Sequence, residues 1–173
     1  MSADDVVPPG ETGKIVVNLT SPESFKGYYN RPEATQRAIR SGWYFTGDTG
    51  YVDEDGDLWV TGRADDMIIT GGENVHPLEV EEVLARHPDV VEVAVAGLPD
   101  ERLGQVVVGF VVPRRPDLSL AEIEAFCRAS NRLARFKLVL VKTIPKSPVG
   151  KILRRLLVAG EYQSFDGGPV ARS

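Results

Sequence analysis

Short apolar runs separated by turn-rich segments mark the first third of the chain. Residues 13–19 predict a short strand, and the apolar runs at 51–52 and 58–60 flank an acidic Asp-Gly turn, a pattern typical of a β-hairpin. Pro32 predicts the first turn of a helix that runs to about Arg40, because proline needs no N–H partner there. These elements bury too little surface to fold alone, so residues 1–62 are expected to belong to something larger.

From residue 67 onward strands and helices alternate. Residues 67–70 predict a strand and 71–74 a loop, and Pro77 opens a helix with one apolar face, made by Val80, Val83, Leu84 and His87. Two valine-rich strands are expected at 90–96 and 105–112, joined by a polar loop over 97–104.

The C-terminal part predicts one more strand and two more helices. Ser119 and Glu122 form a capping box, which starts a helix that buries Leu120, Ile123 and Cys127. A strand is expected at 138–141 and a helix at 151–159, with Arg154 and Arg155 pointing outward. Together the elements of residues 67–160 predict a small α+β domain with a short sheet and packed helices, and residues 161–173 a flexible tail.

Charge is unevenly distributed along the 173 residues. The net charge is −5, yet residues 125–160 hold nine Lys and Arg and neither Asp nor Glu. This basic segment indicates either a polyanionic partner, such as a nucleotide, a coenzyme or a nucleic acid, or a solvated face without a ligand. Nucleic acid is disfavoured because, among these basic residues, only Phe136 offers an aromatic face for stacking. No apolar run is long enough to cross a bilayer and no secretory leader is visible, so a cytoplasmic protein without membrane contact is expected.

Three short segments carry candidate chemistry. Asp48 follows a glycine in an aromatic turn, where it could accept both hydroxyls of a ribose or form an Asx-turn. The glycine pair at 71–72 precedes a helix, so it could let the backbone approach a ligand or only permit a turn with positive φ. Lys151 ends a proline-rich loop, where it could stabilise charge on a phosphate or be solvated. His76 is expected to cap the helix after it, and no metal site is predicted.

These segments, in this order and spacing, resemble one known family. Residues 42–48 (GWYFTGD), 62–81 (GRADD followed by TGGENVHPLEVE) and 145–151 (PKSPVGK) are similar to the C-terminal part of AMP-forming acyl- and aryl-CoA synthetases, nearest to benzoate- and chlorobenzoate-type CoA ligases. The resemblance implies two half-reactions. A carboxylic acid and ATP give acyl-AMP and pyrophosphate, and CoA then displaces AMP.

The resemblance also implies roles for individual residues. Asp48 would hold the AMP ribose with help from Arg63, and Lys151 would bridge the carboxylate and the α-phosphate during adenylation. Asp65, within a segment at 63–66, would be the hinge about which the small domain rotates between half-reactions. The loop that faces the active site during thioester formation and lines the pantetheine path would comprise Gly71, Gly72 and Glu73.

Two departures from the family pattern limit these expectations. The phosphate loop and the acid pocket of the family's large N-terminal adenylate-forming domain have no counterpart here. Residues 1–62 are therefore expected to be only a remnant of that domain. The chain alone should therefore be inactive, and the family's Mg²⁺, which accompanies ATP, would have its ligands elsewhere. The segment after Lys137, where relatives contact the CoA nucleotide, is shortened, which favours the alternative of a stand-alone binding or regulatory module. Lys151 would also be a target for a lysine acyltransferase, which would remove its charge.

Overall fold

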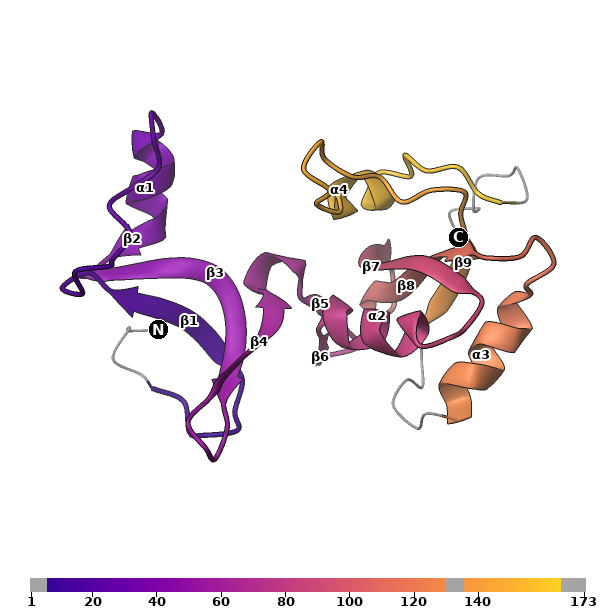
Figure 1. Cartoon of the computed structure of the whole chain (residues 1–173), viewed down its shortest axis with the longest axis horizontal. Coiled ribbons are helices and arrows are strands. Elements are labelled where there is room, and N and C mark those ends of the chain that lie inside the picture. Colours follow the sequence, from indigo (N-terminus) through magenta and orange to yellow (C-terminus); the bar gives the residue numbers. More distant parts are fainter. Residues whose placement is uncertain (1–5, 130–135, 166–173) are drawn as a thin grey trace. The chain divides into compact units, whose positions relative to one another are not determined.

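The computed structural model describes residues 6–129 and 136–165. They form two compact units that divide between Asp65 and Asp66, hereafter unit 1 and unit 2 (Figure 1). Both combine a small sheet with helices, which confirms the expected α+β class. Within the described ranges no helix has the length and apolar character that a bilayer span requires.

Unit 1 is built on one antiparallel sheet, in which β3 is central and pairs with three neighbours. Its elements are β1 (Gly13–Asn18), α1 (Pro32–Ala38), β2 (Ile39–Arg40), β3 (Trp43–Val52) and β4 (Leu58–Arg63), followed by a 3-10 turn at Ala64–Asp66 that begins in unit 1. Helix α1 stops earlier than expected because Ile39 is extended, with φ −106° and ψ 124°, and pairs with Tyr44 of β3.

The expected hairpin between β3 and β4 is confirmed. The carboxylate of Asp53 accepts hydrogen bonds from the backbone N–H of Asp55 (3.1 Å) and Asp57 (2.9 Å), so one side chain organises the turn. It also accepts a 2.6 Å bond from the indole N–H of Trp59. These bonds favour the ionised form and lower the pKa of Asp53, with the indole bond contributing most.

The sheet of unit 1 has a thin core. Among its described residues only Thr49 and Gly50 are buried, whereas Leu58, Trp59 and Val60 are each more than half exposed. The prediction that these elements bury little surface is therefore confirmed.

Unit 2 holds a five-stranded sheet of order β6-β5-β8-β7, with β9 added beside β8 as its one parallel neighbour. Its strands and helices are β5 (Ile68–Thr70), β6 (Glu73–Val75), α2 (Pro77–Ala85), β7 (Val90–Asp100), β8 (Gly104–Pro113), α3 (Leu120–Ala129), β9 (Lys137–Leu140) and α4 (Arg154–Val158).

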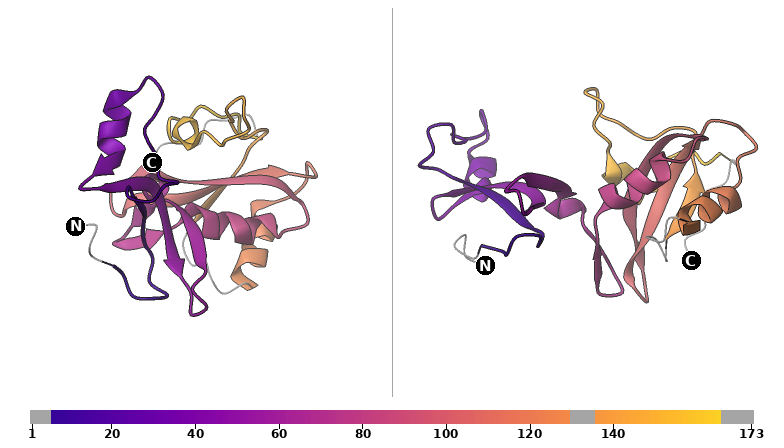
Figure 2. Two further views of the ribbon diagram at one scale, coloured as in Figure 1. Left: turned by 60° about the vertical axis from the view of Figure 1, so that its left-hand side comes forward. Right: turned by 60° about the horizontal axis from the view of Figure 1, so that its bottom comes forward.

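Both faces of this sheet are covered. Side chains of β7 and β8 alternate between two cores, since successive residues of a strand point to opposite faces. One core packs Leu84 of α2 and Ile123 of α3, and the other packs Phe110 of β8 against Leu157 of α4. In Figure 2, left, α4 lies above the sheet and α2 and α3 below it.

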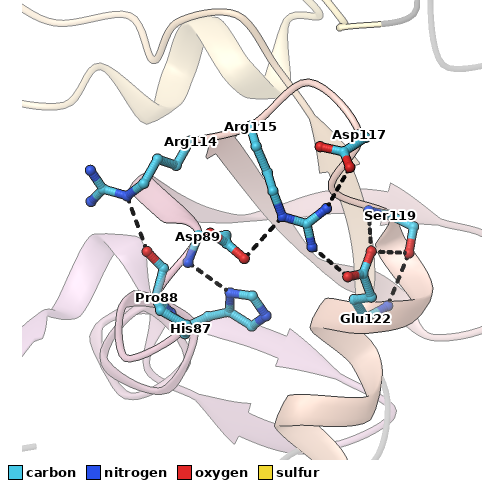
Figure 3. Close-up of polar contacts among 8 residues, drawn as sticks. All are labelled: His87, Pro88, Asp89, Arg114, Arg115, Asp117, Ser119 and Glu122. Atoms are coloured by element: carbon cyan, nitrogen blue, oxygen red, sulfur yellow. Dashed lines mark hydrogen bonds and ion pairs between the residues drawn. The ribbon is translucent and has the colours of Figure 1, made fainter.

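Hydrogen bonds and ion pairs among charged side chains stabilise the start of α3 (Figure 3). Glu122 accepts from the Ser119 N–H at 2.9 Å, and Ser119 Oγ accepts from the Glu122 N–H at 3.3 Å, which confirms the predicted capping box. Arg115 pairs with Glu122, with Asp117 at 3.1 Å and with Asp89 at 3.1 Å. The bonds from Ser119 and Arg115 lower the pKa of Glu122 to about 2. The helix buries Ile123 and Cys127 as expected, but Leu120 is 37% exposed, so its predicted burial was wrong.

Several boundaries of unit 2 differ from the sequence expectation because strand pairing extends elements past local breakers. Residues 71–74 are not a loop throughout but contain the start of β6, and the first half of 97–104 continues β7, pairing out to Asp100 with Gly104. The described part of the expected tail, 161–165, packs on the domain: Tyr162 lies edge-on to Phe110 at 5.0 Å, and the Phe165 N–H donates to the Leu140 carbonyl. Residues 166–173 lie outside the described ranges.

Candidate functional site

Asp48 and Arg63 form the centre of the candidate site in unit 1. They face each other on β3 and β4, and Arg63 Nη1 donates to Asp48 Oδ1 at 2.8 Å and to the Thr46 carbonyl at 3.0 Å. The Asp48 carboxylate thus binds a guanidinium rather than its own backbone, as an Asx-turn would require. Both side chains still reach solvent, with 36% and 42% of their surface exposed. A carboxylate held in this way can accept hydrogen bonds from ligand hydroxyls.

Gly47 is essential to this geometry for a steric reason. Its φ is +82°, and a Cβ placed on it would lie 2.6 Å from Arg63 Nη2. The neighbouring Thr46 fixes the strand from the other side, because its hydroxyl donates to the Ile15 carbonyl and accepts from the Asp48 N–H, each at 3.0 Å. The sequence motif GD around Asp48 therefore encodes close packing of the arginine over the backbone.

A hollow of about 460 Å³ lies within unit 1 beside Arg63 and is lined by Lys14, Ile15, Tyr28, Arg31, Ala34, Arg37, Ala38, Arg40, Phe45, Thr46, Gly47, Arg63, Ala64 and Asp65. Its lining is strongly cationic. Nearby aromatic rings stack, with Phe25 and Tyr44 4.2 Å apart, and a hydrogen bond with Tyr28 raises the pKa of Tyr44. The expected aromatic surroundings of Asp48 are thus present.

In unit 2, Gly71 and Gly72 form the two-residue turn of the β5-β6 hairpin. Thr70 pairs with Glu73, and the two glycines have φ values of +57° and +88°. Gly71 is tied down by its N–H, which donates to the Leu103 carbonyl at 3.0 Å, whereas a Cβ on Gly72 would meet no atom within 4 Å. Gly72 therefore presents open backbone, which suits close approach by a ligand and also satisfies the requirement for positive φ.

His76 departs from its expected role. It occupies the N-cap position of α2, but its side chain makes no capping hydrogen bond. The ring is buried, and its Nδ1 has no hydrogen-bond partner among the described residues. The proline at N1 has no N–H, so the first turn of α2 has one unpaired N–H group fewer.

Lys151 lies in a tight hairpin formed by residues 145–153, hereafter the Lys151 hairpin. Its base is closed by the Leu153 N–H, which donates to the Pro145 carbonyl at 2.9 Å, and its tip by bonds from Ser147 N–H to the Lys151 carbonyl (2.8 Å) and from Lys151 N–H to Ser147 Oγ (3.1 Å). The Lys151 side chain is exposed and, among described residues, its ammonium has no hydrogen-bond or ion-pair partner. Lys151 precedes α4 rather than opening it, so the predicted helix start was wrong by three residues.

Arg154 was expected to point outward, and the structure places it inward instead. Its three donor nitrogens each have a partner: Nε donates to the Val95 carbonyl (3.0 Å), Nη1 to Asp66 (3.2 Å) and Nη2 to Glu81 (2.7 Å). Glu81 is 9% exposed and also accepts from the Val95 N–H at 2.8 Å. The signal missed in the sequence is a glutamate on the apolar face of α2, which requires a buried partner.

The structure does not bring all the sequence-predicted residues together. Within unit 2, no hydrogen bond or ion pair of the described residues joins Lys151 to the Gly71-Gly72 turn or to Glu73, which is exposed. Asp65 is exposed at the last position of unit 1, next to the boundary between the units. No three His, Cys, Asp or Glu side chains cluster for a metal within the described part of the chain, so no step is assigned here to Mg²⁺.

Comparison with known proteins identifies the class of enzyme that this chain resembles. Residues 79–151 match the family described as AMP-binding enzyme C-terminal domain. These residues lie in unit 2, which is thus similar to the small C-terminal domain of AMP-forming, adenylate-forming enzymes, and the resemblance expected from the sequence is confirmed.

The individual relatives are CoA ligases. The chain is 51% identical to a 2-succinylbenzoate–CoA ligase of Geobacillus kaustophilus over 156 residues, which are 86% of this chain and 31% of that protein. It is 46% identical to a 4-chlorobenzoate–CoA ligase of Arthrobacter over 155 residues, 87% of this chain and 29% of the relative. The o-succinylbenzoate CoA synthetase of Bacillus subtilis, solved with the acyl-adenylate OSB-AMP, superposes with a TM-score of 0.80 at 37% identity, covering 91% of this chain and 32% of that one. The chain therefore spans about a third of the length of these relatives.

Proposed function

We propose that this chain is the C-terminal portion of an ATP-dependent carboxylic acid–CoA ligase. The observation that carries the proposal is the 51% identity to a CoA ligase over 86% of the chain. In the first half-reaction a carboxylate oxygen attacks the α-phosphorus of ATP, the bond to the β-phosphate breaks, and acyl-AMP and pyrophosphate form. In the second, the sulfur of CoA attacks the acyl carbon, the thiol loses its proton, and AMP leaves. The proposal keeps the cytoplasmic location expected from the sequence.

Each candidate residue has a proposed part in this chemistry. Asp48, oriented by Arg63, accepts hydrogen bonds from the ribose hydroxyls of the nucleotide. Lys151 supplies a positive charge to the carboxylate and α-phosphate as negative charge develops there. The hydrogen-bonded hairpin around Lys151 supports this role, because it fixes the backbone from which the exposed ammonium extends.

The second half-reaction is proposed to use the other loop of unit 2. Rotation about Asp65 would replace Lys151 at the reaction centre with the turn formed by Gly71 and Gly72, and Glu73 would follow them. The open backbone at Gly72 supports this assignment, since a pantetheine chain needs a surface without side chains. CoA, ATP and the acid are thus the proposed small-molecule ligands.

A large N-terminal adenylate-forming domain is the proposed partner, present either in the same polypeptide or as a separate chain. The exposed sheet of unit 1 supports this, because Leu58, Trp59 and Val60 present an apolar surface that a folded protein would normally cover. We infer that the chain alone does not adenylate an acid. Acylation of Lys151 by a lysine acyltransferase would switch adenylation off by removing the positive charge.

Reconstitution tests the proposal. The large domain of a related CoA ligase is mixed with this chain, and acid-dependent release of pyrophosphate is measured for the mixture and for each part. Activity in the mixture alone, lost in Lys151→Ala and kept in Lys142→Ala, supports the proposed function; Lys142 is a second exposed lysine of unit 2. Absence of both activity and association with any large domain would instead favour a stand-alone binding or regulatory module.

A further inference from the structure

Two polar contacts, one at each end, join the Lys151 hairpin to β7. Near its start, Lys146 forms an ion pair with Glu92, and the backbone of Lys146 bridges to Ile152. Directly after its end, Arg154 donates to the Val95 carbonyl at 3.0 Å. Because Leu153 closes the base of the hairpin and precedes Arg154 in the chain, the position of the guanidinium fixes where the hairpin leaves the domain.

Arg154 also reaches the segment at which unit 2 begins. Its Nη1 lies 3.2 Å from Asp66 Oδ2, although the two residues are 88 positions apart in sequence. Asp66 is the first residue of unit 2 and follows Asp65 directly. One guanidinium therefore joins the residue after the proposed hinge to the base of the loop that carries the proposed catalytic lysine.

The three acceptors around Arg154 require the donor geometry of an arginine, which a lysine does not have. Three acceptors lie in three directions, namely the Val95 carbonyl, Asp66 and Glu81, and the nitrogens Nε, Nη1 and Nη2 bond one each. A lysine ammonium offers donors from a single point and lacks the planar fork that matches this arrangement. The side chain of Arg154 is 23% exposed, that of Glu81 11% and that of Asp66 33%, so water competes less for the bond to Glu81 than for the bond to Asp66.

We propose that Arg154 is a positioning residue that fastens the Lys151 hairpin to Asp66, so that the residue after the hinge and the lysine move as one rigid piece. This inference rests on the proposed function. Rotation at Asp65 is then transmitted to the hairpin, and the backbone of Lys151 returns to the same position relative to Asp66 in each catalytic cycle. Glu81 holds the arginine in orientation, because its Oε1 accepts from Arg154 and from the Val95 N–H at once.

The first test uses the full chain alone and requires no catalysis. Amide hydrogen exchange is compared between Arg154→Gln and the matched control Arg155→Gln, which changes the exposed neighbour. Exchange at the Lys151 and Leu153 amides is expected to rise at least about tenfold more in Arg154→Gln than exchange at the amides of β8. Equal protection of the hairpin in both variants would overturn the positioning role. Should Arg154→Gln fail to fold, Arg154→Lys, which keeps the charge but not the fork, is expected to show the same change at smaller size.

The second test uses the reconstituted ligase. Arg154→Gln and Asp66→Asn are expected to lower kcat for adenylation by about tenfold or more with KM for ATP within about twofold, because the nucleotide still binds while the lysine is misplaced. Thioester formation from supplied acyl-adenylate should stay at the wild-type rate in both variants, because Lys151 is not used in that half-reaction. Equal losses in both half-reactions, or an unchanged kcat for adenylation, would overturn the proposal. Failure of the wild-type chain to reconstitute activity would count against the proposed function only, since hydrogen exchange judges the positioning role by itself.

Discussion

Arg154 Nη2 donates to Glu81 Oε1 at 2.7 Å and thereby joins helix α4 to helix α2 across the edge of β7. The same carboxylate oxygen accepts the Val95 N–H at 2.8 Å. The pair of Arg154 and Glu81 has little solvent exposure, and both side chains make further hydrogen bonds. It joins α4, α2 and β7, which lie far apart in the sequence. Breaking it leaves an uncompensated charge, so it provides a sensitive test of the described packing.

Glu81→Ala is expected to lower the free energy of unfolding of the chain by about 3 kcal/mol, because Arg154 and the Val95 N–H both lose their partner. Urea unfolding followed by circular dichroism measures the change. Glu82→Ala is the matched control: this neighbouring glutamate is exposed, and its loss should shift stability by no more than about 0.5 kcal/mol. Equal effects of the two substitutions would show that Glu81 is not paired as described.

Gly47→Ala is expected to destabilise unit 1 more than Gly56→Ala does. Both glycines have positive φ, +82° and +87°, so both substitutions carry the same backbone strain of about 1 kcal/mol. Only at position 47 would the new Cβ also meet the Arg63 guanidinium. Both tryptophans of the chain, Trp43 and Trp59, lie in unit 1, so their fluorescence during urea unfolding reports on this unit. Equal midpoints for the two variants would mean that the Arg63 guanidinium moves aside without measurable loss of stability.

Acid should weaken the start of α3 in a defined range. The folded-state pKa of Glu122 is lowered from 4.5 to about 2 by the bonds from Ser119 and Arg115. A carboxylate with a lowered pKa stabilises the fold above its unfolded value, and that contribution disappears as the pH falls from about 4.5 to about 2. Amide protection of the first turn of α3 should follow this range and should lose that dependence in Glu122→Gln. Glu101→Gln, which alters an exposed glutamate elsewhere, should leave it unchanged.

Cys127 should be unreactive in the folded chain. Its side chain is 1% exposed in the core beneath α3, and burial raises the pKa of the thiol, so little of the reactive thiolate is present at neutral pH. Labelling with a thiol-specific disulfide reagent should be slow in buffer and rapid in denaturant. Rapid labelling without denaturant would contradict the described packing of α3 and would reopen a chemical role for this cysteine.

Local signals in the sequence were sufficient for some features and insufficient for others. The Asp53 hairpin turn and the Ser119-Glu122 capping box each depend on bonds within a few residues, so their sequence pattern determines them. The length of β7 does not: Gly97 and Pro99 interrupt the local pattern, but pairing with β8 continues past both to Asp100. Strand pairing of this kind is a tertiary effect that a single sequence does not reveal.

Some residues of the candidate site could likewise be predicted from the sequence, and others could not. Asp48 and Arg63 were predicted as partners through a family resemblance, and the β3-β4 register places them opposite each other. The apolar pattern of a helix over 151–159 places Arg154 with Arg155 on the outer face, whereas α4 begins at Arg154 itself, and the Arg154 side chain reaches β7 from the first turn. Its partners Glu81 and Asp66 lie 73 and 88 residues away, so helical periodicity could not identify them.

The Lys151 hairpin and the Gly71-Gly72 turn are proposed to serve different half-reactions. Single-turnover kinetics of the reconstituted ligase separate the two roles. Adenylation from acid and ATP is measured separately from thioester formation from supplied acyl-adenylate and CoA. Lys151→Ala is expected to abolish the first reaction and to leave the second near the wild-type rate, whereas Gly72→Val is expected to slow the second and spare the first. Loss of both half-reactions in either variant, or loss of neither, would contradict these separate roles.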